Sequence, residues 1–490
     1  MWTYLKSPED RLAFLLTLSF LNENDLSSLD ALFSELSEQS FPAGQKQGHD
    51  QSWDRLNKLI QAHEIQPLAY YRALELNQKA LGSPKLHFPA ALLNQWKMEA
   101  KKIEDVQISR FKSAQVVLDF FRENSIPWVV LKGQSLAEEV YQLSAYKKMN
   151  DIDILVQPDD LQKIYDFLKL KKHISVMQLS ENNPRAQEKY SHHWPPLLSS
   201  DFHCVWGVYW SLVSPLKKYH LDMEGVWSRI KPVNFAGQKA HRLHSEDILH
   251  HLCLHLNLYK SGLKEVQDIY NLVRHFDRPQ NRSQDPQHDQ SQNEFNWSRF
   301  EKKVRETGSF DEVYHALRTT YAYSGISSLD SVANSLEPEV SVRMKKFVKQ
   351  KCSSPERLLR SRSTYISRIE KTYGFFTITK SPLEKAYFLL QMWKLLLFPP
   401  QNELIKMSYS KPSSSFFENL KLRLLGPSLV SRQLIHDLGW KLHIILILSH
   451  HLVLIRCFWN HLRQRPQGPQ KLKEILRSLG VSDPNQIPEF

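Results

Sequence analysis

The alternation of apolar and polar residues is most regular between residues 92 and 156. Leu92 to Asn124 carries apolar residues at helical spacing among Lys and Glu, which predicts one long helix. The apolar run Trp128 to Leu131 ends at Lys132-Gly133, and Ser135 to Tyr141 has a helical composition, so a strand, a glycine turn and a helix are expected. Asp151 to Val156 alternates with period two, which predicts a second strand with both aspartates on one face.

Most of the remaining pattern is helical. Helices are expected within residues 8–37, from Trp53 to Leu76, from Pro158 through Leu168, and from Ser245 through Leu256. Residues 278–294 are almost free of apolar side chains, so they are predicted to form a loop or linker. This organisation predicts a helical region over 1–124, a core with its following helices over 125–277, a polar linker over 278–296, and a mainly helical, basic region over 297–490.

The glycine turn and the aspartate pair together suggest phosphate chemistry. Adjacent carboxylates repel each other unless a cation shares them, and such oxygen ligands suit Mg²⁺, which usually arrives with a substrate's phosphates. Gly133 lets backbone N–H groups approach phosphate oxygens, and Lys132 or Ser135 adds a charge or a hydroxyl. Each feature alone is more often a plain turn or a solvated strand edge. Their order and spacing favour a site formed with Asp151 and Asp153.

These residues resemble a known family, the bacterial uncharacterised nucleotidyltransferases of the DNA polymerase β-type superfamily. The resemblance rests on Leu131-Lys132-Gly133, Leu136, Tyr141, Lys147 and the run Asp151 to Val156, and extends over about Trp53 to Leu272. It implies an α+β fold with a polymerase β-like core, a small mixed sheet flanked by helices. It also implies that the aspartate pair holds the metal and that the turn lies near the triphosphate. Lys147 stands where the family usually has arginine. A lysine cannot make the bidentate contact with a phosphate or carboxylate that an arginine makes.

The resemblance also suggests where further site residues lie. Such enzymes need a third carboxylate, and Asp201 with His203 fits the family's acidic-x-His pattern; on a strand the two would share a face. The alternative is that Asp201 is a turn residue. Asp268 matches a family helix, where it orients a substrate group or makes a structural polar contact. His251 and His255 have the spacing of a helical metal pair, but packing in the core or at the active site is the favoured interpretation.

Composition and charge limit the kinds of partner, metal site and cellular location to expect. The chain has 490 residues, 41% of them hydrophobic, which excludes disorder of the whole chain. Its net charge of +12 suggests an anionic partner or only a solvated basic surface. Four scattered cysteines indicate neither a disulfide framework nor a zinc site and fit a cytoplasmic protein. The apolar run 442–455 is short for a membrane span, so a buried helix or peripheral membrane contact is expected there.

We therefore expect a Mg²⁺-dependent nucleotidyltransferase that moves a nucleoside monophosphate from a nucleoside triphosphate to a hydroxyl and releases pyrophosphate. Asp151, Asp153 and Asp201 would hold the metal, and Lys132, Gly133, Ser135 and Lys147 the nucleotide, with His203 and Asp268 in support. The acceptor is left open between protein, RNA and a small molecule or sugar. The alternative is a non-catalytic nucleotide-binding or scaffold module that associates with a membrane through its C-terminal region. No feature indicates a specific protein partner, the preferred nucleotide or the oligomeric state.

Overall fold

The computed structural model describes residues 5, 7–21, 23–38, 47–79, 88–175, 191–215, 217, 219–256, 261–277, 295–353 and a few isolated positions between 382 and 421. The chain divides into two compact units, Met1–Arg362 and Ser363–Phe490. Nearly all described residues belong to the first unit, and the account below concerns that unit. The predicted linker at 278–296 lies within it by sequence, although residues 278–294 are outside the described part.

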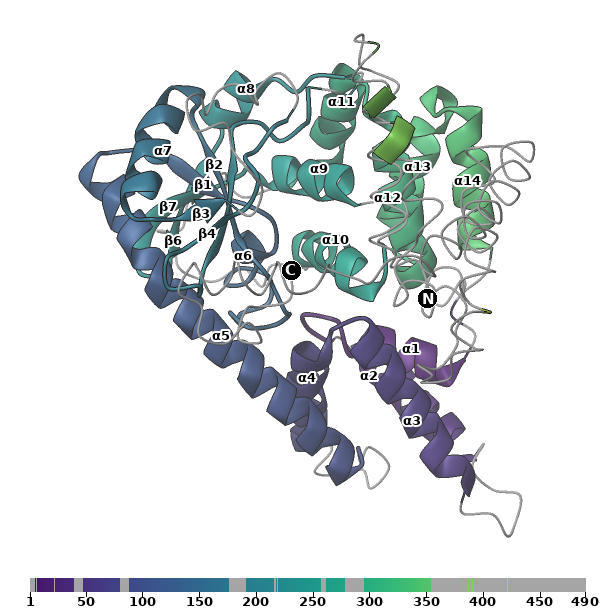
Figure 1. Cartoon of the computed structure of the whole chain (residues 1–490). Coiled ribbons are helices and arrows are strands. Elements are labelled where there is room, and N and C mark those ends of the chain that lie inside the picture. The colour runs from purple at the N-terminus through teal and green to yellow at the C-terminus, as the bar shows by residue number, and fades with distance from the viewer. Residues whose placement is uncertain are drawn as a thin grey trace, which may run out of the picture. The chain divides into compact units, whose positions relative to one another are not determined.

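The described strands form one mixed sheet of seven strands in the order β3-β4-β5-β2-β1-β7-β6 (Figure 1). The strands are β1 (Trp128–Val130), β2 (Ile152–Val156), β3 (Ile174–Ser175), β4 (Leu197–Leu198), β5 (Val205–Tyr209), β6 (Lys231–Phe235) and β7 (Gln238–Arg242). The central strand β2 runs antiparallel to β1 and parallel to β5, with Asp153 opposite Gly207. The two predicted strands are thus confirmed and lie side by side.

Period-two alternation along β2 separates two apolar clusters. Ile152, Ile154 and Val156 pack on one face with α7 (Leu161–Leu170) and the second half of α5 (Ala90–Glu123). Leu155 belongs to the other cluster, which the helices on the opposite face share. Asp153 points to that second face, because it alternates with Ile152 and Ile154. The hydrophobic effect therefore fixes which way the aspartate side chain is directed.

The apolar cluster on the second face also includes residues of helices from distant parts of the sequence. They are α1 (Pro8–Leu15), α2 (Glu23–Glu38), α3 (Gln47–Ala62), α4 (Gln66–Lys79), α6 (Lys132–Leu136), α8 (Met223–Ser228), α9 (Ser245–His255), α10 (Leu263–Phe276), α11 (Trp297–Thr307), α12 (Phe310–Ser324), α13 (Ser327–Leu336) and α14 (Val342–Cys352). Of these, α6 contacts both α9 and α10, and α9 contacts α10. Figure 1 shows α9 and α10 between the sheet and α12–α14. The long helix predicted over Leu92 to Asn124 is confirmed as α5.

Two local predictions are wrong. The helix expected over Ser135 to Tyr141 begins at Lys132, contains Gly133 and ends at Leu136.

The second wrong prediction is the strand at residues 201–203. Asp201 and His203 do not lie on a strand, because the chain turns tightly between β4 and β5. The backbone N–H of Ser199 donates to Cys204 O at 2.8 Å, and Phe202 has a left-handed φ of +61°. The apolar run that follows, Val205–Tyr209, supplies the strand. Alternation counted from Asp201 missed this turn because an acidic-x-His spacing is the same in a turn and in a strand.

Several predictions lie partly or wholly outside the described residues. The apolar run 442–455, Cys457 and the basic residues beyond 353 are among them. Cys204, Cys253 and Cys352 are free thiols and buried. In the part of the chain that the structure describes, no helix is both long and apolar enough to cross a membrane. Lys351, from the predicted basic run, is buried and donates to Ser261 Oγ, so it is not part of a basic surface.

Candidate functional site

The turn after β1 brings Lys132 against the central strand. Leu131 N–H donates to the carbonyl oxygen of Asp153 at 2.9 Å, which joins the end of β1 to β2. Lys132 then has a left-handed φ of +54° and begins the short helix α6. A non-glycine residue in this conformation costs about 1 kcal/mol or more. Such local strain persists where the surrounding contacts fix the residue in place.

The Lys132 ammonium forms an ion pair with Asp153 and a hydrogen bond with Tyr209. Lys132 Nζ lies 2.7 Å from Asp153 Oδ2 and donates to Tyr209 Oη at 2.7 Å. Burial by itself lowers the pKa of Lys132, but the carboxylate of Asp153, with Tyr209 and Asp151, outweighs burial and raises the pKa. Burial followed by Asp153 raises the pKa of Tyr209. The lysine is therefore charged and the tyrosine neutral at physiological pH.

Asp153 is buried, with 5% of its surface exposed, and its two oxygens differ. Oδ2 receives Lys132, whereas Oδ1 has no hydrogen-bond partner among the described residues. Oδ1 lies directly over Gly207 on β5, where a Cβ would stand 2.1 Å from it. Gly207 therefore makes room for the carboxylate. A buried carboxylate oxygen without a partner is unfavourable unless a donor or cation reaches it.

Asp151 lies one residue before β2 and is half-buried. A second cation is associated with it. Arg110 on α5 is 4% exposed and donates to Gln107 Oε1 at 2.9 Å. Burial lowers the pKa of Arg110, while Cys204 and Asp151 act in the opposite direction. Both aspartates of the predicted pair thus lie in the field of a cation from another element, half-buried for Lys132 and buried for Arg110.

A second cluster of hydrogen-bonded side chains is centred on Asp268 of α10 and contacts the glycine turn at Gly133. Asp268 Oδ1 accepts from Tyr141 Oη at 2.9 Å and from Tyr146 Oη at 3.2 Å, and Oδ2 pairs with Lys147. Tyr146 Oη also donates to the carbonyl of Gly133 at 3.1 Å. A Cβ on Gly133 would lie 2.8 Å from Tyr146 Oη. The glycine is therefore required for this close packing, and Lys147 is engaged by Asp268.

The other predicted residues make local contacts. Ser135 Oγ donates to the carbonyl of Lys132 at 2.7 Å. Asp201 Oδ1 accepts from Ser113 Oγ at 2.8 Å, from Ser199 Oγ at 2.5 Å and from the backbone of His203 at 3.2 Å. These hydrogen bonds lower the pKa of Asp201 against the opposing effect of burial, which is the largest single influence. The contacts of Asp201 thus tie the β4–β5 turn to α5.

The residues around Asp153 could supply one or two carboxylate ligands to Mg²⁺, with the other ligands coming from water and substrate. The described residues contain no group of three or more His, Cys, Asp or Glu side chains that could hold a metal ion, so Asp201 does not form one cluster with the aspartate pair. Mg²⁺ typically binds one or two carboxylates and completes its shell with water and substrate phosphates. The free Oδ1 of Asp153 and the adjacent Asp151 match that arrangement. The residues present therefore suit a metal that arrives with a nucleotide.

Three residues at this site were not identified as site residues from the sequence. Gly207 on β5 lies against Asp153, and Tyr209 on β5 accepts from Lys132. The sequence signal that could have identified them is their spacing of two residues, which places both side-chain positions on one face of a strand. His251 on α9 is 4% exposed, and neither ring nitrogen has a hydrogen-bond partner among the described residues. Its ring centroid lies 6.0 Å from that of His255. The helical spacing of the two histidines was noted, but it does not reveal that α9 packs against α6 and that the charge of Lys132 acts on His251.

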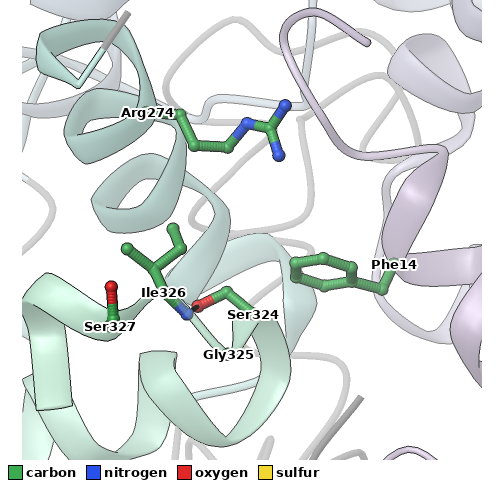
Figure 2. A pocket seen from close by; sticks show the side chains of 6 residues that line it. All are labelled: Phe14, Arg274, Ser324, Gly325, Ile326 and Ser327. Atoms are coloured by element: carbon green, nitrogen blue, oxygen red, sulfur yellow. Dashed lines mark hydrogen bonds between the residues drawn. The ribbon is translucent and has the colours of Figure 1, made fainter. Parts of the chain in front are cut away.

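A separate cavity lies away from these residues. It has a volume of about 340 Å³ and is lined by Phe14, Arg274, Ser324, Gly325, Ile326 and Ser327 (Figure 2). These residues come from α1, α10 and the α12–α13 turn. Arg274 Nη2 pairs with the buried Asp25 at 2.6 Å, so its charge is already balanced. None of the residues predicted from the glycine turn or the aspartate pair lines this cavity.

A mixed sheet that carries a lysine–glycine turn beside a buried aspartate is compatible with a nucleotidyltransferase. Residues 49–324 match the model of a family described as "Uncharacterised nucleotidyltransferase". Because the match covers more than half of the 490 residues, the chain belongs to this family. No curated protein and no solved structure matches the chain. Membership of this family supports nucleotidyl transfer as the reaction and a nucleoside triphosphate as the substrate.

Proposed function

We propose that the protein transfers a nucleoside monophosphate from a nucleoside triphosphate to a hydroxyl group, with Mg²⁺ bound at Asp151 and Asp153. The observation that carries the proposal is the buried Oδ1 of Asp153, which has no hydrogen-bond partner among the residues that the structure describes and lies beside the Lys132–Gly133 turn. Family membership supports the reaction class. The finer assignment to a polymerase β-like core follows the resemblance of the sequence around Asp151 and Asp153.

In this proposal the chain mainly positions charge. The acceptor oxygen forms a bond to the α-phosphorus, the bond from that phosphorus to the bridging oxygen breaks, the hydroxyl proton is lost and pyrophosphate leaves. Mg²⁺ would neutralise phosphate charge during this displacement. Lys132 adds a fixed positive charge directly beside Asp153, and Tyr209 and the Asp268 cluster hold the turn in place. Positioning and electrostatic stabilisation are the main contributions of a protein to such transfers.

The second candidate is a nucleotide-binding module without catalysis. The observation that favours it is the position on β5 opposite Asp153, which is Gly207 and not an acid. Without a third carboxylate near the attacking oxygen, nucleotide binding would be retained but activation of the acceptor would be weak. The third-ligand role of Asp201 stays a prediction.

The test uses the whole chain with each α-³²P-labelled nucleoside triphosphate and Mg²⁺, with protein, RNA and small-molecule fractions of a cell lysate as acceptors. Wild-type protein is expected to transfer label, and the substitutions Asp151→Asn and Asp153→Asn are each expected to reduce transfer on the order of 10²-fold or more. Asp166→Asn is the matched control, since Asp166 is an exposed aspartate on α7 that contacts Gln162. The labelled fraction would identify the acceptor class.

The outcomes separate the two candidates. Mg²⁺-dependent nucleotide binding that Asp153→Asn weakens, without label transfer to any fraction, would favour the binding module. Absence of both binding and transfer would reject the nucleotide site altogether. Asp201→Asn decides the remaining question. Loss of transfer with binding retained would support Asp201 as the third carboxylate, whereas unchanged transfer would assign it to the β4–β5 turn.

A further inference from the structure

Two buried side chains beside the lysine–glycine turn have no hydrogen-bond partner in the part of the chain that the structure describes. His251 on α9 is 4% exposed and Gln134 on α6 is 5% exposed. Both ring nitrogens of His251, and both the amide nitrogen and the oxygen of Gln134, lack a partner among the described residues. The two side chains are therefore not hydrogen-bonded to each other. Buried polar groups are nearly always satisfied, so each such group requires an explanation.

The two side chains belong to elements that meet at the proposed nucleotide site. Gln134 is two residues after Lys132 in α6, and α6 contacts α9, which carries His251. The charge of Lys132 also acts on His251, although burial is the larger influence, and together they lower the pKa of His251 to about 3. His251 is therefore a neutral imidazole near Lys132, with one nitrogen that donates and one that accepts.

The chemistry of these two groups suits an uncharged polar ligand group. A neutral imidazole and a carboxamide each offer one donor and one acceptor side. Phosphate oxygens only accept, and they are matched by Lys132 and by backbone N–H groups. A ribose hydroxyl or the hydrogen-bonding edge of a base both donates and accepts, so it can satisfy both side chains.

We propose that His251 and Gln134 bind the uncharged part of the nucleotide, through the base edge or the ribose hydroxyls, next to the Lys132–Asp153 pair. The inference rests on the proposed nucleotide site and deepens it. It makes these two side chains specificity-determining residues, whereas Lys132 and the aspartates act on phosphate and metal.

The experiment measures dissociation constants of ATP, GTP, CTP and UTP, of the 2′-deoxy and 3′-deoxy forms of the tightest one, and of inorganic tripolyphosphate, all with Mg²⁺. His251→Phe and Gln134→Leu are each expected to weaken binding of the preferred triphosphate by about 5- to 10-fold, as expected for the loss of a neutral hydrogen bond. Binding of tripolyphosphate should not change. If a ribose hydroxyl is the ligand group, the deoxy form that lacks it should bind wild type and variant equally; if the base is, the preference among the four bases should weaken.

His250→Phe is the matched control. His250 is the adjacent residue of the same helix and is 1% exposed, but its Nε2 lies 2.7 Å from Ser309 Oγ. Its replacement should lower the melting temperature of the nucleotide-free protein and leave nucleotide affinity unchanged. His251→Phe should show the opposite pattern, because it removes buried polar atoms that have no hydrogen-bond partner among the described residues.

The results distinguish this inference from the proposed function. If wild type binds none of the triphosphates, both are rejected. If Asp153→Asn weakens Mg²⁺-dependent binding while His251→Phe and Gln134→Leu bind every triphosphate like wild type, only this inference is rejected, and ordered water is the partner of the two side chains. A loss of affinity for tripolyphosphate equal to that for the nucleotide would also overturn it.

Discussion

Asp153 and Gly207 face each other across the parallel pair β2 and β5, and the Asp153 carboxylate fills the space that a side chain at position 207 would occupy. A Cβ at position 207 would lie 2.1 Å from Oδ1, closer than any non-bonded contact allows. Asp153 therefore depends on a glycine in the neighbouring strand for its conformation. This relationship links the sheet register directly to the proposed metal ligand.

Gly207→Ala should displace the Asp153 carboxylate and weaken Mg²⁺-dependent nucleotide binding about tenfold or more, since binding depends on ligand position. Isothermal titration with nucleotide and Mg²⁺ measures the change. The control is Val208→Ala on the same strand, whose side chain packs in the opposite apolar cluster. It should lower the free energy of unfolding by about 1–3 kcal/mol and leave the Mg²⁺ response unchanged. Normal binding by Gly207→Ala would show that Oδ1 is not a ligand.

Lys132→Met should leave Asp153 buried without its cation. The expected loss in the free energy of unfolding is about 3–5 kcal/mol, as for other buried pairs that lose one partner. Mg²⁺ should then raise the melting temperature more in the variant than in wild type, because the metal replaces the missing charge. Thermal unfolding with and without Mg²⁺ measures both effects. Equal stability of the variant and wild type, without a Mg²⁺ effect, would contradict this role of the ion pair.

Lys147→Met should destabilise the protein by about 3–5 kcal/mol, because Asp268 would remain buried with only the two tyrosine hydroxyls and no cation. Lys147→Arg keeps the charge and should retain most of the stability. Lys302→Met, which breaks an exposed pair with Glu306, serves as control and should have no measurable effect. Chemical denaturation compares the three variants. A harmless Lys147→Met would show that Asp268 does not require the lysine.

Stability should fall as the pH is lowered, because two adjacent histidines are buried in the neutral form. Burial lowers the pKa of His250 and of His251 from 6.5 to about 3. Below pH 6.5 the unfolded chain takes up a proton at each position while the folded chain does not, so stability is present above that pH and is lost towards pH 3. Each histidine contributes about 1.4 kcal/mol per pH unit within this window.

His251→Phe should therefore reduce the pH dependence of the melting temperature between about pH 6.5 and pH 5 by the contribution of one proton. His250→Phe should reduce it equally, although it also lowers the melting temperature at neutral pH through the lost contact with Ser309. Differential scanning calorimetry at several pH values measures both. If neither variant changes the slope, the histidines are not buried in the neutral form.

Local helices and strands and the residue types of the site could be predicted from the order of the amino acids alone. The long helix α5 and the strands β1 and β2 follow from apolar spacing, which is a local property, whereas the helix expected over Ser135 to Tyr141 begins earlier, at Lys132, and ends at Leu136. Period-two alternation also predicted that the Asp153 side chain lies on the face of β2 opposite to Ile152 and Ile154. The structure confirms this, because Ile152 and Ile154 belong to one apolar cluster and Leu155, on the same face as Asp153, belongs to the other. The family membership agrees with the motif that these residues form.

The contacts between distant residues follow from the packing of the folded chain and could not be predicted from the sequence. The strand order places Gly207 opposite Asp153 and Tyr209 at Lys132, and helix packing brings Asp268 under Gly133 and His251 near Lys132. These contacts join positions more than fifty residues apart, and their spacing along the chain carries no periodic signal. The turn at Asp201 likewise depends on hydrogen bonds to Ser113 of α5. Long-range packing and hydrogen bonding, which are not encoded in any one segment, therefore completed the site.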